Sequence, residues 1–290
     1  MDNKIVGIIV VTALVAAAIA GGAYIATYKA DTSMNYSILD DPESSLKAGL
    51  TIVTDSDNER IMVKIVEVDH DTGAVNYNKK YEIVTDNYDA GTIEDFEMDR
   101  LIPFDIDDEK KIPSGITVTK DGNTLIINGK GSASAGPLLN GTMMYDNLTI
   151  VFDGKIPKKI NGSVDISLSY MSHKFALKGI FNTDAEGHVA IMGCAITYQD
   201  SMTAESRIAF IEKEFHHFNE LDYTGCVITD GEKESYSGRD CDVKIINGKS
   251  TVLHDKFQDY HALCYKGFFV KGSGLIDDKQ GEKTITYFYG

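Results

Sequence analysis

Short runs of β-branched and aromatic residues follow one another through most of this chain. Six of them are Ile116–Thr119, Thr124–Ile127, Leu148–Phe152, Val164–Tyr170, Phe175–Phe181 and His188–Tyr198. This composition is typical of β-strands, and clusters of Gly, Asn, Asp or Pro separate most of the runs. No regular alternation of strands with helices is visible. The sequence therefore predicts a mainly β protein built from antiparallel meanders.

Local patterns predict the faces of the strands and the positions of the turns. In Val164–Tyr170 the apolar residues fall at every second position, which indicates one buried face and one face in water. Asn and Gly tolerate the positive φ of tight turns, so Asn-Gly and Asp-Gly pairs predict hairpin turns. The pairs are Asn128-Gly129, Asp153-Gly154, Asn161-Gly162 and Asn247-Gly248.

A few short helices are expected among the strands. The longest covers Thr203–Asn219, where apolar residues spaced three or four apart would form one face and Ser201 or Thr203 would cap the start. These apolar residues are Ala204, Ile208, Ile211, Phe215 and Phe218. Shorter helices are expected within Thr92–Leu101 and at Pro42–Lys47.

An internal repeat organises the soluble part. Segments opening at Gly49, Gly115 and Gly225 begin alike, and later parts of the second and third segments match at offsets of 86, 88 and 89 residues. Asn161-Gly162, for example, aligns with Asn247-Gly248. We therefore expect a cytoplasmic tip and anchor at 1–29, a tether at 30–45, β unit 1 at 46–91, β unit 2 at 92–199, and a helix with β unit 3 at 200–290. The charged segment Asp105–Lys111 is expected to be a solvated linker.

The N-terminal segment Ile5–Tyr28 contains no charged residue and lies between Lys4 and Lys29. As a helix it would be about 36 Å long, enough to cross a hydrocarbon core of about 30 Å. The sequence thus predicts one transmembrane helix. A cleaved signal peptide is the alternative, with Ala18-Ile19-Ala20 as the small-residue site before Gly21.

Either interpretation places the rest of the chain outside the cytoplasm. Asp2–Ile25 resembles the N-terminal anchors of archaeal single-pass surface proteins, and this resemblance implies a location at the cell membrane. Four Asn-x-Ser/Thr sequons agree with that side, so we expect glycosylation at Asn35, Asn140, Asn147 and Asn161.

The charge balance limits the partners of the soluble part. With 44 acidic and 28 basic side chains, the formal net charge is −16. Such a surface repels phosphate backbones and anionic lipids, so nucleic acid is not expected as a partner. The expected partners are the membrane, through residues 5–28, and another surface protein or an envelope component.

Four cysteines lie in the last hundred residues: Cys194, Cys226, Cys241 and Cys264. Outside the cytoplasm an even number of cysteines favours disulfides, with three possible pairings. The competing interpretations are buried thiols and a zinc site. The zinc site would draw on His216, His217, Cys226, Cys241, His254, His261 and Cys264, but it lacks a tight Cys-x2-Cys pair. No cofactor is expected.

No catalytic motif is complete. The alternating acids Asp55-x-Asp57-x-Glu59 and Asp69-x-Asp71-x-Gly73 lack the Gly and Glu of a helix-loop-helix calcium site. A pair of carboxylates for glycoside cleavage stays an open alternative, because the distance between them is set by the fold and cannot be read from the sequence. The sequence favours a binding or structural role at the cell surface over an enzymatic one. The alternatives are a carrier of an apolar ligand in a curved sheet and an extracellular hydrolase.

Overall fold

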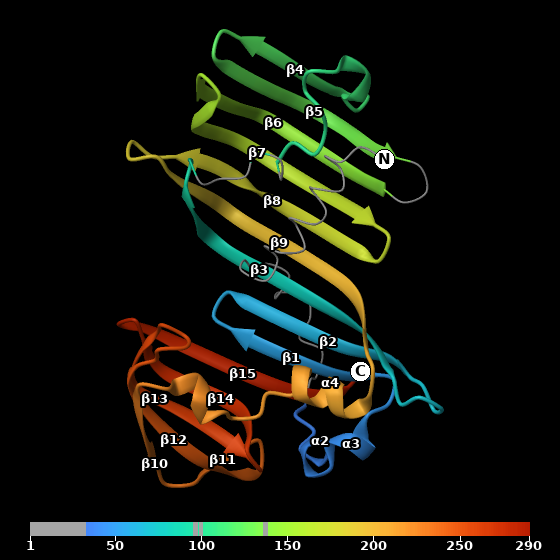
Figure 1. The fold of residues 1–290 in the computed structure, drawn as a ribbon. Helices are drawn as coiled ribbons and strands as arrows, with labels where there is room; N and C mark the ends of the chain where they lie inside the picture. The colour runs from blue at the N-terminus through green and yellow to red at the C-terminus, as the bar shows by residue number, and fades with distance from the viewer. Residues whose placement is uncertain (1–32, 95–97, 99–100, 136–138) are drawn as a thin grey trace. The chain divides into compact units, whose positions relative to one another are not determined.

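The computed structural model describes residues 33–94, 98, 101–135 and 139–290. Among these residues, unit 1 consists of residues 81–200 and unit 2 of residues 33–80 and 201–290. Two long strands, β3 (Val75–Thr92) and β9 (His188–Ala204), pass from one unit to the other (Figure 1). The predicted membrane segment 5–28 lies outside the described residues, and no helix within them is both long and apolar enough to cross a bilayer.

Unit 1 is an antiparallel meander in which β4 to β9 follow one another in space as in sequence (Figure 1). Its elements are η2 (Glu109–Lys111), β4 (Ile116–Asp121), β5 (Thr124–Ala135), β6 (Leu139–Asp153), β7 (Ile156–Tyr170), β8 (His173–Thr183) and β9, with the second part of β3 beside β9. The six runs predicted from the sequence lie in β4 to β9, so the antiparallel β prediction is confirmed for this unit.

The two faces of the unit 1 sheet differ. One face is apolar and fully buried at residues such as Val164 and Ile166, as the alternating pattern predicts. The segment after β3 covers this face with apolar side chains, among them Ile93, Leu101, Ile102, Phe104 and Ile112. The buried hydroxyl of Tyr145 donates to the Leu101 carbonyl at 2.7 Å and holds that segment to the sheet.

Unit 2 has a longer antiparallel strand order, β10-β12-β13-β14-β15-β1-β2-β3, with the short β11 paired to β12. Its strands are β1 (Leu50–Ser56), β2 (Glu59–Val68), the first part of β3, β10 (Cys226–Asp230), β11 (Glu234–Tyr236), β12 (Arg239–Lys249), β13 (Lys256–Tyr265), β14 (Phe268–Ile276) and β15 (Lys279–Tyr289). Its helices are α2 (Ser37–Asp40), α3 (Pro42–Ser45), α4 (Arg207–Glu214) and η3 (Glu220–Tyr223).

One core holds unit 2 together, and both chain segments contribute to it. Tyr77, Phe210 and Tyr287 are its largest fully buried side chains, and the rings of Tyr77 and Phe210 meet edge to face at 4.9 Å. Residues 33–45 were expected within the tether, but they fold into α2 and α3 and bury Ile38 and Leu39. These apolar side chains explain why the segment packs instead of remaining extended.

The predicted helix Thr203–Asn219 is too long. Residues up to Ala204 belong to β9, and α4 begins only after Ser206, whose side chain accepts a hydrogen bond from the Ala209 amide. The cap is therefore neither Ser201 nor Thr203. Of the predicted apolar face, Ile211, Phe215 and Phe218 pack against the core, but Ile208 is 56% exposed and Phe210 is buried in its place. The predicted helix at Thr92–Leu101 falls largely outside the described residues.

Three of the four predicted hairpin turns lie inside strands, opposite bulges in the partner strand β6 or β13. Asp153-Gly154 does lie between β6 and β7, but Asn128-Gly129, Asn161-Gly162 and Asn247-Gly248 lie within β5, β7 and β12. The three glycines have φ of 108°, 124° and 115°, and beside each of them the partner strand, β6 or β13, carries one extra residue. Bulges increase local twist and bend a strand.

The two units share this bend. In unit 1 the Asn128 side chain accepts the Asn147 amide at 2.7 Å, and in unit 2 the Asn247 side chain accepts the Asp259 amide at 2.8 Å. Both accepted amides belong to residues with φ of 50°. Asn247-Gly248 therefore occupies the place of Asn128-Gly129, not that of Asn161-Gly162 as the sequence alignment predicted. The internal repeat itself stays a prediction.

Candidate functional site

A group of buried and half-buried ionisable side chains lies in unit 2, beside the end of α4. We define the α4 polar cluster as Thr54, Tyr77, Lys79, Glu214, His216 and Lys283. These residues come from β1, β3, β15, α4 and the segment that follows α4. Of these six residues, only His216 belongs to a candidate site predicted from the sequence.

Glu214 is a carboxylate in an unfavourable place. It ends α4, where the helix dipole disfavours negative charge, and only 3% of its side chain is exposed. Two groups on β3 compensate: the Tyr77 hydroxyl donates to Oε1 at 2.9 Å, and Lys79 Nζ lies 2.7 Å from Oε2. A buried carboxylate with both oxygens satisfied is a structural ion pair.

His216 follows Glu214 by two residues, and hydrogen bonds hold both its backbone and its ring. Its backbone amide donates to the Tyr287 hydroxyl at 3.3 Å, and its ring Nε2 lies 3.1 Å from Thr54 Oγ1. Burial, followed by the positive charges of Lys283 and Lys79, lowers the pKa of His216 to about 4. The imidazole is therefore neutral at physiological pH.

This imidazole makes unit 2 sensitive to mild acid. The folded pKa of about 4 lies below the value of about 6.5 in an unfolded chain, so the unfolded state takes up the proton first. The stabilisation is complete above pH 6.5 and is lost as the pH falls toward 4. Between pH 7 and pH 5 we expect a loss of about 2 kcal/mol, measured by urea unfolding. His216→Gln should reduce this loss; an unchanged pH slope would contradict the assignment.

Lys283 is the least compensated charge of the cluster. It lies on β15 on the same face as the buried Ile285 and Tyr287, and burial lowers the pKa of its amine. Among the described residues no carboxylate lies within ion-pair distance of its Nζ; its nearest recorded contact is the Phe269 ring, with the centroid 5.9 Å away. The alternating pattern Lys283-x-Ile285-x-Tyr287 could have revealed its inward position.

All four cysteines are free thiols, so the predicted disulfides are not formed in this structure. Cys194 is buried in unit 1, whereas Cys226, Cys241 and Cys264 belong to unit 2. Burial raises the pKa of the Cys194 thiol to about 11 and that of Cys264 to about 12. Such thiols are poor nucleophiles at neutral pH.

The zinc alternative finds no support in the described part of the chain, where no three His, Cys, Asp or Glu side chains converge as metal ligands. His217 Nδ1 instead forms a hydrogen bond of 2.9 Å with the Phe218 carbonyl. Its ring packs against the Phe268 ring, with the two centroids 5.2 Å apart. The sequons are divided: Asn140 and Asn147 are exposed, and Asn35 and Asn161 are half-buried.

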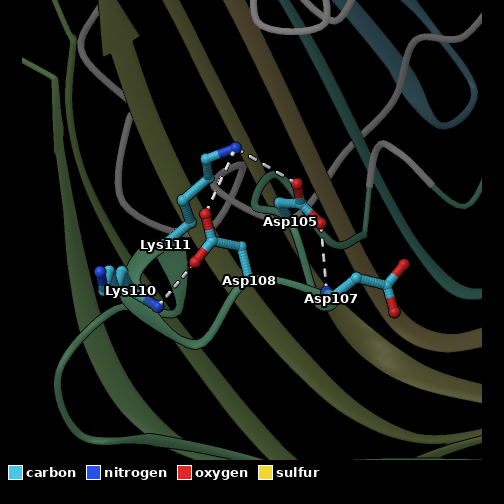
Figure 2. A network of polar contacts seen from close by, with 5 residues as sticks. All are labelled: Asp105, Asp107, Asp108, Lys110 and Lys111. Carbon is cyan, nitrogen blue, oxygen red and sulfur yellow. Dashed lines mark hydrogen bonds and ion pairs between the residues drawn. The ribbon is translucent and has the colours of Figure 1, made fainter.

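The acidic loops have local structural roles. Asp55 forms a two-pronged ion pair with Arg60, and Asp69 accepts the amides of Asp71 and Thr72 to close a turn. Figure 2 shows Asp105–Lys111, the segment expected to be a solvated linker. There Lys111 Nζ lies 3.4 Å from Asp105 and 3.6 Å from Asp108. The segment folds because Ile106 and Ile112 pack against the unit 1 core.

No protein-family model, curated protein or solved structure matches this chain.

Proposed function

We propose that this chain is a single-pass protein of the cell membrane whose folded part lies outside the cytoplasm and has a binding or structural role there. The uncharged segment 5–28 supports the anchor, because its length fits a bilayer. The exposed sequons at Asn140 and Asn147 are compatible with an external location. The anchor and the sequons concern only the location of the protein and do not identify its partner.

The observation that carries the binding role is the solvent-facing side of the unit 1 sheet. Aligned side chains cross five strands there, one from each strand from β5 to β9. One row is Ser132, Thr142, Ser167, Ala176 and Thr197; the next is Lys130, Met144, Asp165, Lys178 and Ala195. The side chains of the first row are short, and short side chains lose little conformational entropy when a partner covers them. This face, which we call the open face, therefore suits an extended partner of the envelope.

The alternatives receive less support. An apolar carrier needs an internal cavity, but the concave side of unit 2 is filled by large side chains such as Tyr77, Phe210 and Tyr287. A hydrolase needs converging carboxylates, and the buried carboxylate Glu214 is already satisfied by Lys79 and Tyr77. The packed core therefore argues against a carrier, and the satisfied carboxylate argues against a hydrolase.

The test measures binding of the full chain, in a nonionic detergent, to envelopes of the organism that encodes it. A Thr142→Glu/Ser167→Glu variant places two carboxylates on the open face and should weaken saturable binding about tenfold or more. Thr229→Glu, at an exposed position of β10 in unit 2, is the matched control and should bind like the unchanged chain. Absence of saturable binding, or equal binding by all three proteins, would reject the proposal.

A further inference from the structure

A row of residues on the inner face of unit 2 brings Lys283 to a point where three strands meet. Ser56 on β1 pairs with Lys283 on β15, and Lys283 pairs with Gly272 on β14. Lys283 is mostly buried but has no ion-pair partner among the described residues. An ammonium group held in this way destabilises the fold, since burial without a counter-charge carries a desolvation cost.

Tyr260 brings a hydroxyl to the same place. Its ring stands over Gly272: a Cβ atom at this glycine would lie 2.1 Å from Tyr260 Oη and 2.7 Å from the tip of the Phe269 ring. Only glycine therefore leaves room for the hydroxyl beside the Lys283 row. Within the described chain Tyr260 Oη has no hydrogen-bond partner, yet no fully buried side-chain polar atom there is unsatisfied. The hydroxyl must therefore reach solvent.

The ring of His216 offers a third donor in one of its two neutral tautomers. Thr54, which binds its ring Nε2, pairs with Ile285, two residues along β15 from Lys283. When the Thr54 hydroxyl donates to Nε2, the imidazole proton resides on Nδ1, and Nδ1 has no recorded partner among the described residues. The charge of Lys283 is close enough to affect the titration of this ring.

We propose that Lys283, Tyr260 and His216 form a binding site for the oxyanion group, carboxylate or phosphate, of a small ligand. An oxyanion would supply the direct ion-pair partner that Lys283 lacks and would accept hydrogen bonds from the other two donors. The site lies in unit 2 and is separate from the open face of unit 1, so it extends the proposed function without depending on it.

The surrounding charges limit what can enter. Glu59 and Asp222 face Lys283, and Asp57 and Glu282 face Tyr260 closely enough to influence their titration. None of these carboxylates forms an ion pair with Lys283. They would repel a large polyanion, so the ligand has to be compact, with its oxyanion placed directly against the ammonium group.

Calorimetric titration of the full chain, in nonionic detergent, with inorganic phosphate and separately with acetate tests this site. We expect saturable binding of at least one probe, and the tighter probe identifies the group that is recognised. Lys283→Met should weaken binding about tenfold or more, because a charge-assisted hydrogen bond is lost. Tyr260→Phe removes only the hydroxyl and should weaken it about fivefold. Lys256→Met is the matched control, because Lys256 is an exposed lysine of the same unit paired with Asp278, and it should bind normally.

A thermal melt completes the test. Lys283→Met should unfold at the same or a higher temperature than the unchanged chain, since it replaces a poorly compensated ammonium by an apolar group of similar length. Weaker binding together with undiminished stability would show that the lysine serves a ligand and not the fold. If neither probe saturates, or if Lys283→Met and Tyr260→Phe bind as well as the unchanged chain, the proposal is wrong. Tyr260→Phe alone decides the matter should Lys283→Met not fold.

Discussion

Replacement of Lys79 by methionine is expected to lower the free energy of unfolding of unit 2 by about 3 to 5 kcal/mol. The change leaves the Glu214 carboxylate, which is 3% exposed, without its ammonium partner at 2.7 Å. The Tyr77 hydroxyl still donates to it, but a single neutral donor does not offset a buried charge at the negative end of a helix dipole. Urea unfolding followed by near-ultraviolet circular dichroism of the tyrosines measures the loss.

Two variants separate this effect from a general sensitivity of α4. Lys213→Met changes an exposed lysine of the same helix and should cost less than about 0.5 kcal/mol. Lys79→Met combined with Glu214→Leu removes both charges and should recover most of the stability, because apolar replacements of a buried ion pair are often neutral or favourable. A loss below about 1 kcal/mol for Lys79→Met alone would show that Glu214 is not dependent on it.

The second large effect is expected at the bend of unit 1. In Gly129→Ala the new Cβ would lie 2.1 Å from the Gly115 carbonyl oxygen, at a residue with φ of 108°. A backbone atom cannot rotate away as a side chain can, so β4 has to separate from β5 or the bulge has to rearrange. We expect a cost of about 3 kcal/mol in the unfolding of unit 1, measured by urea titration.

Gly122→Ala is the matched control, since it lies in the turn of the same hairpin. Its φ is 58°, but no atom lies within 4 Å of the added Cβ. Only the intrinsic preference against a left-handed conformation remains, and this costs about 1 kcal/mol. Equal losses for the two glycines would mean that backbone conformation, and not the close approach to Gly115, controls the bend.

The strands could be predicted from the sequence because their signal is local. Each strand of the sheet buries one face, so each strand carries its own local signal. This signal is the alternation of apolar residues in Val164–Tyr170 and the β-branched runs of β4 to β9. The bulges could not be predicted, since the glycine of an Asn-Gly pair adopts a positive φ both in a tight turn and opposite a bulge. The partner strand decides between them: Asn128 and Asn247 are fixed by amides of Asn147 and Asp259, which the sequence does not place opposite them.

The polar cluster was missed for a related reason. Glu214 looks like an ordinary solvent-facing residue of an amphipathic helix, and its partners Tyr77 and Lys79 precede it by 137 and 135 residues. Only the folded chain joins these positions. His216 was considered as a metal ligand, whereas its actual neighbours are a threonine hydroxyl and two lysines. Long-range pairing of single residues leaves no periodic trace in a sequence.

The pairing of β1 with β15 has a consequence for synthesis of the protein. Leu50 on β1 lies opposite Tyr289 on β15, so β1 meets this neighbour only after residues 279–289 have left the ribosome. The whole of residues 81–200 emerges in between and can complete the unit 1 meander first. At about 5 to 20 residues per second, the exposed edge of β1 waits on the order of tens of seconds. During that interval the nascent chain carries one finished unit and one open strand edge, the state in which chaperones and aggregation compete for it.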